Sequence, residues 1–117
     1  MRYKTLKRNG EFHRAYTRGR SSVGGCLVTY AVKKKGGLFR VGITSSKKIG
    51  NAVTRNRARR VIRAALAEVM PQPPKGYDIV FVARAVTAKK KSGQIARVMR
   101  AQLTELGVLQ QEKPDAE

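Results

Sequence analysis

Hydrophobic and polar residues alternate along this chain with a period that changes several times, and the first stretch predicts a short helix. Three apolar residues recur there at helical spacing: Phe12, Ala15 and Tyr16. Asn9 is a residue type suited to the N-cap, Glu11 lies in the first turn, and Gly19 can end the helix. We therefore expect a helix over residues 9–18, preceded by a basic and loosely ordered segment over residues 1–8.

The pattern then changes to a period of two, which is typical of strands. In the stretch 26–33, every second residue would share one face: Cys26, Val28, Tyr30 and Val32. A turn of lysines and glycines occupies residues 34–37, and a second alternating stretch covers residues 38–46. We expect these two strands to pair as a hairpin.

A second helix is predicted to follow Asn51 and to end before Pro71. Its apolar stripe comprises Ala58, Val61, Ile62, Ala65, Leu66 and Val69. Residues 77–84 are β-branched, aromatic and apolar without interruption, which predicts a strand buried on both faces.

A third helix is predicted to begin with Ser92 as its cap and to end at Gly107. Its apolar stripe comprises Ile95, Val98, Met99, Leu103 and Leu106. The polar residues 110–117 are expected to fray. The order α-β-β-α-β-α predicts an α+β sandwich, one domain over residues 1–117 with an ordered core at about 8–107.

Charge narrows the range of functions. The 117-residue chain carries 26 Lys and Arg against 7 Asp and Glu, a net charge of +19. Between Phe12 and Ala67 there is no acid and there are fourteen Lys and Arg. Because such self-repulsion destabilises a free compact protein and a polyanion relieves it, the pattern predicts nucleic-acid binding. A membrane-surface protein would need a long amphipathic basic helix or a lipidation motif, and neither is visible.

The chain also lacks an apolar run of membrane-spanning length and an apolar signal core at its N-terminus. Its one cysteine, Cys26, excludes an internal disulfide and a cysteine-based metal site, and lies in an apolar stretch typical of a core residue. We expect a cytoplasmic protein with no membrane partner.

The second predicted helix carries the densest basic chemistry. At about 100° per residue, four side chains share an arc beside the apolar stripe: Arg55, Asn56, Arg59 and Arg63. Arg57 and Arg60 lie on the other side. A solvated helix surface normally pairs such cations with acids four residues away, and none is present. Arginine binds phosphate with a planar fork, so these two faces are typical of an RNA- or DNA-binding helix.

The remaining patterns favour RNA and argue against catalysis by this chain. A helix-turn-helix needs two adjacent helices, whereas a strand precedes this basic helix. Single-stranded RNA stacks on aromatic side chains beside basic groups, and four residues could form such a groove, with core packing as the alternative for each: Phe12, Tyr16, Val28 and Tyr30. His13 has no carboxylate at a recognisable spacing except Glu11, and the seven acids show no paired spacing for metal-assisted hydrolysis. We expect no catalytic residue and no metal ligand.

The stretch RVGITSSKKIGNAVTRNRARRVIRAAL, residues 40–66, closely resembles the signature of the bacterial ribonuclease P protein component. NGEFHRAYTRG at residues 9–19 is similar to the first helix of that family, and YDIVFVAR at 77–84 to its last strand. The resemblance covers roughly residues 5–106. It implies a mixed sheet of three to four strands with a left-handed β-α-β crossover, a fold shared with a ribosomal protein domain.

The resemblance also implies a function. The family's protein subunit binds the catalytic RNA and the 5′ leader of precursor tRNA, and assists Mg²⁺-dependent removal of the leader. The RNA carries the chemistry and the Mg²⁺, so the protein would hold no cofactor tightly and would need no obligate protein partner. By the same resemblance, the leader cleft is walled by Phe12, Tyr16, Val28, Tyr30, Arg55, Asn56, Arg59 and Arg63. The catalytic RNA or other phosphates would contact Ser46, Lys47, Lys48, Asn51, Arg57 and Arg60.

Two other functions stay open on composition. A ribosomal or other structural RNA-binding protein would have the same charge. A stand-alone endonuclease is disfavoured because the acid–base set that it needs is missing.

Overall fold

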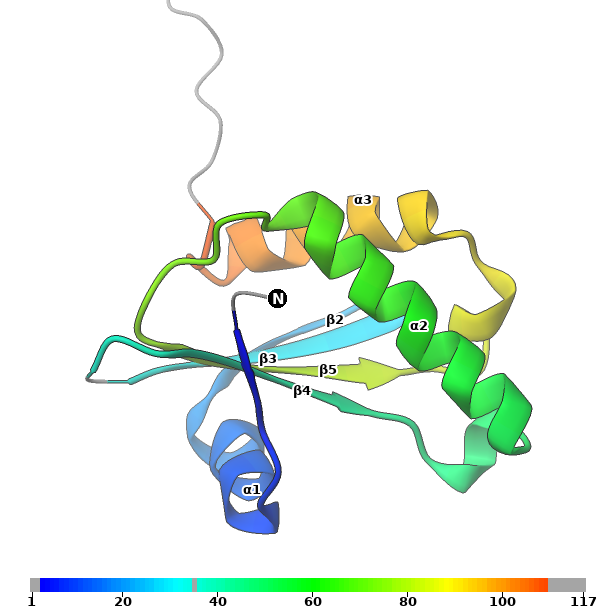
Figure 1. The fold of residues 1–117 in the computed structure, drawn as a ribbon, viewed down its shortest axis with the longest axis horizontal. Helices are drawn as coiled ribbons and strands as arrows, with labels where there is room; N and C mark the ends of the chain where they lie inside the picture. The colour runs from blue at the N-terminus through cyan, green and yellow to red at the C-terminus, as the bar shows by residue number, and fades with distance from the viewer. Residues whose placement is uncertain (1–2, 35, 110–117) are drawn as a thin grey trace, which may run out of the picture.

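The computed structural model describes residues 3–34 and 36–109. The strands are β1 (Lys4–Thr5), β2 (Arg20–Val23), β3 (Leu27–Lys33), β4 (Phe39–Thr44) and β5 (Tyr77–Ala83). The α-helices are α1 (Asn9–Arg18), α2 (Ala52–Val69) and α3 (Ser92–Glu105), and the 3₁₀ helices are η1 (Lys47–Ile49) and η2 (Thr87–Lys89). The α+β class and the three predicted helices are confirmed (Figure 1).

The five strands form one mixed sheet in the order β1-β4-β5-β3-β2. β4 runs parallel to both β1 and β5, whereas β3 is antiparallel to β5 and β2. The predicted hairpin of residues 26–46 is therefore wrong, because β5 lies between β3 and β4. β5 is the most continuously apolar strand, with buried side chains on both faces, and burial favours it at the centre of the sheet.

The chain passes from β4 through η1 and α2 into the parallel strand β5. Both strands point the same way in Figure 1, β4 nearer the viewer, with α2 above the sheet. This path turns in the left-handed sense, as the family resemblance implied and against the usual right-handed preference of such units.

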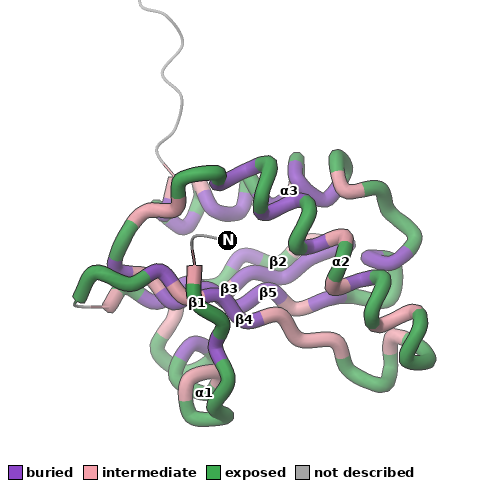
Figure 2. Tube along the Cα trace, in the orientation of Figure 1, coloured by how far each residue is buried: buried purple, intermediate pink, exposed green. Residues whose placement is uncertain are grey.

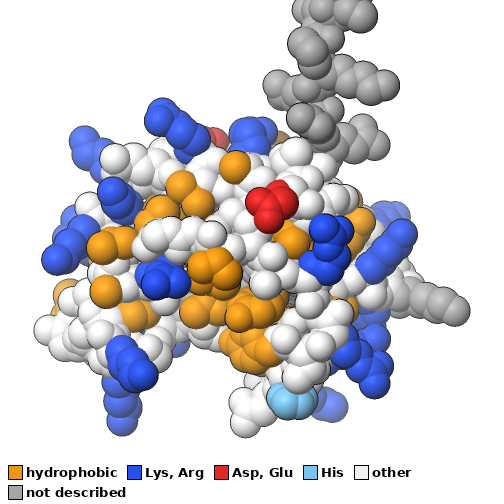
Figure 3. All heavy atoms as spheres, turned by 180° about the vertical axis from the view of Figure 1, so that it is seen from behind, with side chains coloured by type: hydrophobic (Ala, Val, Ile, Leu, Met, Phe, Trp, Pro, Cys, Tyr) orange, Lys and Arg blue, Asp and Glu red, His pale blue; other side chains and the backbone are white. Residues whose placement is uncertain are grey.

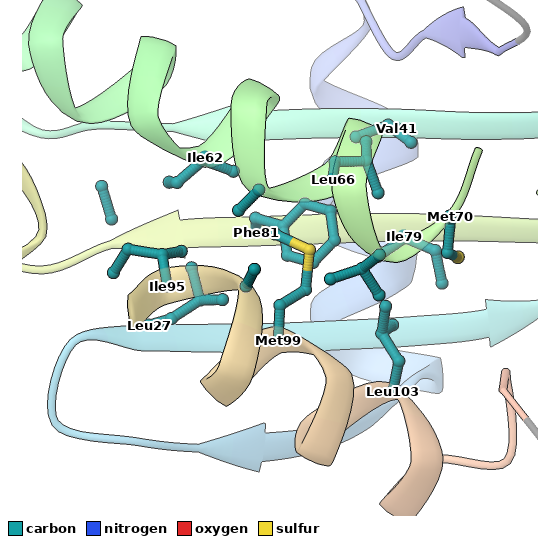
Figure 4. Close-up of a cluster of buried hydrophobic side chains, with 14 of the residues drawn as sticks. Leu27, Val41, Ile62, Leu66, Met70, Ile79, Phe81, Ile95, Met99 and Leu103 are labelled. Atoms are coloured by element: carbon teal, nitrogen blue, oxygen red, sulfur yellow. The ribbon is translucent and has the colours of Figure 1, made fainter. Parts of the chain in front are cut away.

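The main core lies between the sheet and the two helices α2 and α3. Figure 4 shows the side chains of these helices converging on the strands, with Phe81 of β5 between Ile62 and Leu66 of α2 and Met99 of α3. The predicted stripe of α2 is buried at Ala58, Ile62, Ala65, Leu66 and Val69, and Figure 2 shows the burial alternating along the helices. Burying these faces is the main favourable term that holds the helices on the sheet.

The first helix, α1, covers the opposite face of the sheet (Figure 1). A smaller apolar cluster forms there from Leu6, Ala15 and Val80, with Phe12, Tyr30 and Val82 packed against it. α1 and α2 are thus separated by the thickness of the sheet, which decides how the functional residues are grouped.

Several expected boundaries and strands need correction. The segment 1–8 was expected to be loosely ordered, yet Lys4–Thr5 pairs with β4 and Leu6 is buried. β2 was not predicted either, because a short edge strand of polar residues carries no clear alternation. The sheet therefore has five strands rather than three or four.

The helix caps also differ from expectation. α1 is capped by Arg8 rather than Asn9, since the Glu11 carboxylate accepts the backbone N–H groups of Lys7 and Arg8 at 3.2 and 3.1 Å. α3 is capped by Lys91 rather than Ser92. Gly107 follows the end of α3 with a φ of 80°, as a helix stop requires. The expected fraying of residues 110–117 lies outside the described residues.

Candidate nucleic-acid interface

The aromatic residues predicted from the sequence gather on the face of the sheet that α1 covers. Tyr16 of α1 packs edge-on against Tyr30 of β3, with ring centroids 4.9 Å apart and planes at 75°. Tyr16 is 41% exposed, whereas Phe12 is half-buried and Val28 is buried. Tyr16 and Tyr30 thus offer accessible ring surface, while Phe12 and Val28 chiefly support them.

An apolar strip continues this surface across the strands. The strand register places Val23 of β2 beside Val28, and Val28 beside Val82 of β5. Val23 is 70% exposed, which is unusual for a valine on a strand. Figure 3 shows an orange apolar band across the middle of the molecule, with Lys and Arg side chains around its margin. We call the surface formed by Phe12, Tyr16, Val23, Val28, Tyr30 and Val82 the aromatic face.

A network centred on Arg40 attaches α1 to the sheet beside this surface. Arg40 of β4 donates two hydrogen bonds to the Asp78 carboxylate of β5, at 2.9 and 2.7 Å, and also pairs with Glu11 of α1. Asp78 is 2% exposed, so its charge depends on this fork. The network fixes the first turn of α1 over the sheet.

The ionisation of these groups follows from their partners. Backbone N–H groups of Arg8 and Lys7, and then Arg40, hold the pKa of the Glu11 carboxyl below its ordinary value. The Asp78 carboxylate raises the pKa of the Arg40 guanidinium. Both shifts favour the charged forms of Glu11 and Arg40.

The basic helix α2 lies on the other face of the sheet. Asn51 caps it, its Oδ1 accepting hydrogen bonds from the Thr54 backbone N–H at 2.9 Å and from the Thr54 hydroxyl at 3.0 Å. This oxygen therefore stabilises the start of α2. The Ser46 side chain and those of Lys47 and Lys48 in η1 just before it are exposed.

Arg59 and Arg63 line a pocket of about 450 Å³ between α2 and the β1–β4 edge of the sheet. The other lining residues are Tyr3, Thr5, Leu6, Val41 and Ile43. We call this site the arginine pocket. The Arg59 Nε is buried and has no hydrogen-bond partner among the described residues. Burial raises the pKa of the Tyr3 hydroxyl, an effect that nearby Arg63 partly offsets.

The other predicted residues of α2 are presented to solvent. Arg55 is half-buried, and Asn56, Arg57 and Arg60 are exposed. Among the described residues there are two ion pairs, Arg40 with Glu11 and Arg40 with Asp78, and neither involves α2. Uncompensated guanidinium groups with access to solvent are suited to binding phosphates.

The structure thus does not bring all the predicted cleft residues together. Phe12, Tyr16, Val28 and Tyr30 lie on the α1 face, but Arg59 and Arg63 open at the sheet edge on the α2 side. The helical wheel placed Arg59 and Arg63 on one arc, and both line the arginine pocket. The wheel could not show which face of the sheet the helix would cover.

Sequence reasoning missed Tyr3, Thr5, Arg40 and Gly42. The first two were assigned to a loose segment. Arg40 had a signal, since a charged residue between Phe39 and Val41 in a strand should lie on the face opposite the main core. Gly42 had none, because only the packing of α1 shows what a side chain there would meet.

No three His, Cys, Asp or Glu side chains cluster as metal ligands within residues 3–34 and 36–109. Among the helices of this same part of the chain, none is both long and apolar enough to cross a membrane.

Comparisons with known proteins agree with the geometry. A family model described as Ribonuclease P matches residues 1–107. The ribonuclease P protein component of Clostridioides difficile is 46% identical over 84 residues, 71% of this chain and 74% of that protein. That of Brevibacillus brevis is 41% identical over 100 residues, 81% of this chain and 79% of the relative.

Solved structures show the same fold. The RNase P protein of Staphylococcus aureus superposes with a TM-score of 0.77 at 33% identity, covering 89% of this chain and 95% of that one. The RNase P protein of Thermotoga maritima has a TM-score of 0.72 at 22% identity, covering 92% of this chain and 99% of that one.

Proposed function

This chain belongs to the ribonuclease P protein family, and we propose that it holds the precursor tRNA leader on one face and the ribonuclease P RNA on the other. It is thus a subunit of an endoribonuclease that works with the ribonuclease P RNA. The chain itself binds and orients RNA, and the cleavage chemistry takes place on its RNA partner.

One observation carries this proposal: the sheet separates two surfaces of different chemistry. The aromatic face offers exposed rings and apolar side chains. The α2 side offers guanidinium groups without acidic partners among the described residues. Single-stranded RNA needs stacking platforms, and a folded RNA presents mainly phosphates and shape.

The aromatic face is suited to the 5′ leader. An unpaired base can stack on Tyr16, whose ring is supported edge-on by Tyr30. The apolar strip at Val23 and Val28 extends this platform. Mature tRNA lacks the leader, so contacts at this face would favour the precursor over the product.

The α2 side is suited to the catalytic RNA. Arg57 and Arg60 were assigned to it from the sequence, together with Lys47 and Lys48. We now add Arg59 and Arg63, because their pocket lies between α2 and the β1–β4 edge of the sheet, and neither Tyr16 nor Tyr30 lines it. Ser46 is exposed just before η1, and Asn51 caps α2 through its Oδ1.

Within residues 3–34 and 36–109, no group of side chains fits the Mg²⁺ that the family implies. The carboxylates of Glu11 and Asp78 both pair with Arg40. The positive charge of this guanidinium competes with a metal ion for the two carboxylates. We therefore propose that the RNA holds the Mg²⁺, and we derive no catalytic step through the protein.

A reconstitution experiment tests the proposal. Precursor tRNA is incubated at low Mg²⁺ with the protein, with a bacterial ribonuclease P RNA, and with both. We expect accurate removal of the 5′ leader only when both are present. Cleavage by the protein alone would identify a stand-alone nuclease, and an RNA whose activity is unchanged by the protein would contradict the proposed role.

A further inference from the structure

A third basic site lies outside both surfaces, at the end of the sheet where β3 ends and β5 begins. Four cations and two largely apolar side chains are among the residues that line it: Arg14, Arg18, Arg20, Lys33, Tyr77 and Leu106. Its volume is about 430 Å³, within the range of about 300–1,000 Å³ typical of ligand pockets. We call it the cationic pocket.

The fold builds this pocket from separate elements. Arg14 and Arg18 lie one turn apart on α1, about 200° around the helix from Phe12 and Tyr16. β2 pairs with β3 only as far as Arg20 opposite Ala31, so Lys33 continues β3 alongside β5 alone. The pocket opens where the edge strand stops.

A close backbone approach sets the position of α1 at this end. Gly19 joins α1 to β2, and a Cβ there would lie 2.4 Å from the Ala15 carbonyl oxygen and 3.0 Å from that of Ala31. No side chain fits in this space. The glycine therefore lets the end of α1 lie directly against β3, which places Arg18 and Arg20 on either side of the junction.

The charges of the pocket are not neutralised within the described residues. Both ion pairs found there belong to Arg40, and neither includes a lining residue of the cationic pocket. Glu105 is exposed beside Leu106 but pairs with none of these cations. Lys and Arg side chains also gather at the right of Figure 3, where this end of the sheet lies.

The floor has a different chemistry from the rim. Tyr77 is half-buried and Leu106 is buried, so an aromatic ring and an apolar surface lie beneath four cations. Phosphates pair with guanidinium forks and a nucleobase stacks on a ring. A lone inorganic anion would make no use of the apolar floor.

We propose that the cationic pocket binds a segment of single-stranded RNA, with its phosphates on Arg14, Arg18, Arg20 and Lys33 and a base against Tyr77. This proposal rests on the proposed function. It adds a further RNA contact, on the side of α1 opposite the aromatic face. Two sources share this chemistry: a distal part of the leader and an unpaired segment of the catalytic RNA.

The test uses the double variant Arg14→Ala/Arg18→Ala in the reconstituted holoenzyme. Its control is Arg97→Ala/Arg100→Ala, which removes the same charge from exposed positions of α3. Thermal unfolding should be unchanged for both, because all four side chains are exposed. Affinities are measured for the ribonuclease P RNA alone, and then for mature tRNA and for precursors with long and truncated leaders.

We expect the pocket variant to lose roughly tenfold in affinity for one RNA and the control to lose clearly less. The slope of log affinity against log salt should fall by about 1.4, the value for two phosphate contacts to a single strand. A loss confined to long leaders would assign the pocket to the leader. A loss for the ribonuclease P RNA alone would assign it to that partner.

Equal losses in the pocket variant and the control would reflect net charge only and would overturn the proposal, as would no loss at all. Wild-type holoenzyme is assayed in parallel. If it removes the leader normally while the pocket variant binds every RNA like the control, the pocket is refuted and the proposed function stands.

Discussion

The Phe12 ring of α1 lies directly on the backbone of Gly42 in β4. A Cβ at Gly42 would be 2.5 Å from the Phe12 Cε1 and 2.7 Å from its Cζ, closer than real atoms approach. The absence of a side chain at Gly42 therefore sets how near α1 can lie to the sheet, and so sets the position of Tyr16 as well.

Gly42→Ala should force Phe12 and the first turns of α1 away from the sheet. We expect a loss of about 1–3 kcal/mol in the free energy of unfolding, as for other overpacked cores. Denaturant unfolding measures it. Gly10→Ala is the control: Gly10 lies in α1, the helix that carries Phe12, with nothing within 4 Å of a new Cβ. This change should stabilise the protein by about 0.5–1 kcal/mol. Similar effects of the two changes would show that Phe12 does not depend on this contact.

Arg40→Ala should destabilise the protein strongly, because the buried Asp78 would lose its charged partner. The expected cost is about 3 kcal/mol, measured by denaturant unfolding. Glu11→Gln keeps Arg40 on Asp78 and should cost less than about 1 kcal/mol. If both variants cost the same, Asp78 does not depend on Arg40.

Ionisation of Glu11 should contribute to the pH dependence of the free energy of unfolding. Since its folded pKa lies below the ordinary value of 4.5, its ionised form stabilises the fold. This contribution is fully present above pH 4.5 and is lost as the pH falls through the lowered folded pKa. The difference in unfolding free energy between wild type and Glu11→Gln should therefore be constant near neutral pH and shrink in acid. A difference that grows in acid would contradict the assignment.

Tyr16→Ala should weaken binding of precursor tRNA by about 1–3 kcal/mol, the usual value for one stacked base, and should leave mature tRNA unaffected. Tyr16→Phe retains the ring and should bind nearly as wild type. Fluorescence titrations of the holoenzyme with both tRNAs measure this. Equal losses for precursor and mature tRNA would remove Tyr16 from the leader site.

Arg59→Ala should weaken binding of the ribonuclease P RNA itself, and should affect precursor and mature tRNA alike. Arg59→Lys keeps the charge but not the planar fork, so it should restore only part of the affinity. Filter binding of the RNA to each variant measures the effect. A loss limited to the precursor would instead return Arg59 to the leader cleft assigned from the sequence.

Local sequence patterns were sufficient to predict the helices, the buried strand and the RNA-binding family of this protein. The 3.6-residue periodicity of Ala58, Ile62 and Leu66 determined the buried side of α2, and hence which arginines flank it. The unbroken apolar run of residues 77–84 predicted a strand buried on both faces. Charge segregation and the signature in residues 40–66 pointed to RNA and to the family.

Relations between distant segments were decided only by the tertiary structure. The sequence order of residues 26–46 favoured a hairpin, but β5 inserted between its strands because the centre of the sheet buries most apolar surface. Lys4–Thr5 and Arg20–Val23 became edge strands through pairing with neighbours, which a short polar segment does not reveal by itself. Helix periodicity tells which side of α1 or α2 is buried, yet not which face of the sheet each helix covers. That choice separated Tyr16 from Arg59, and placed Arg14 and Arg18 beside the end of β3.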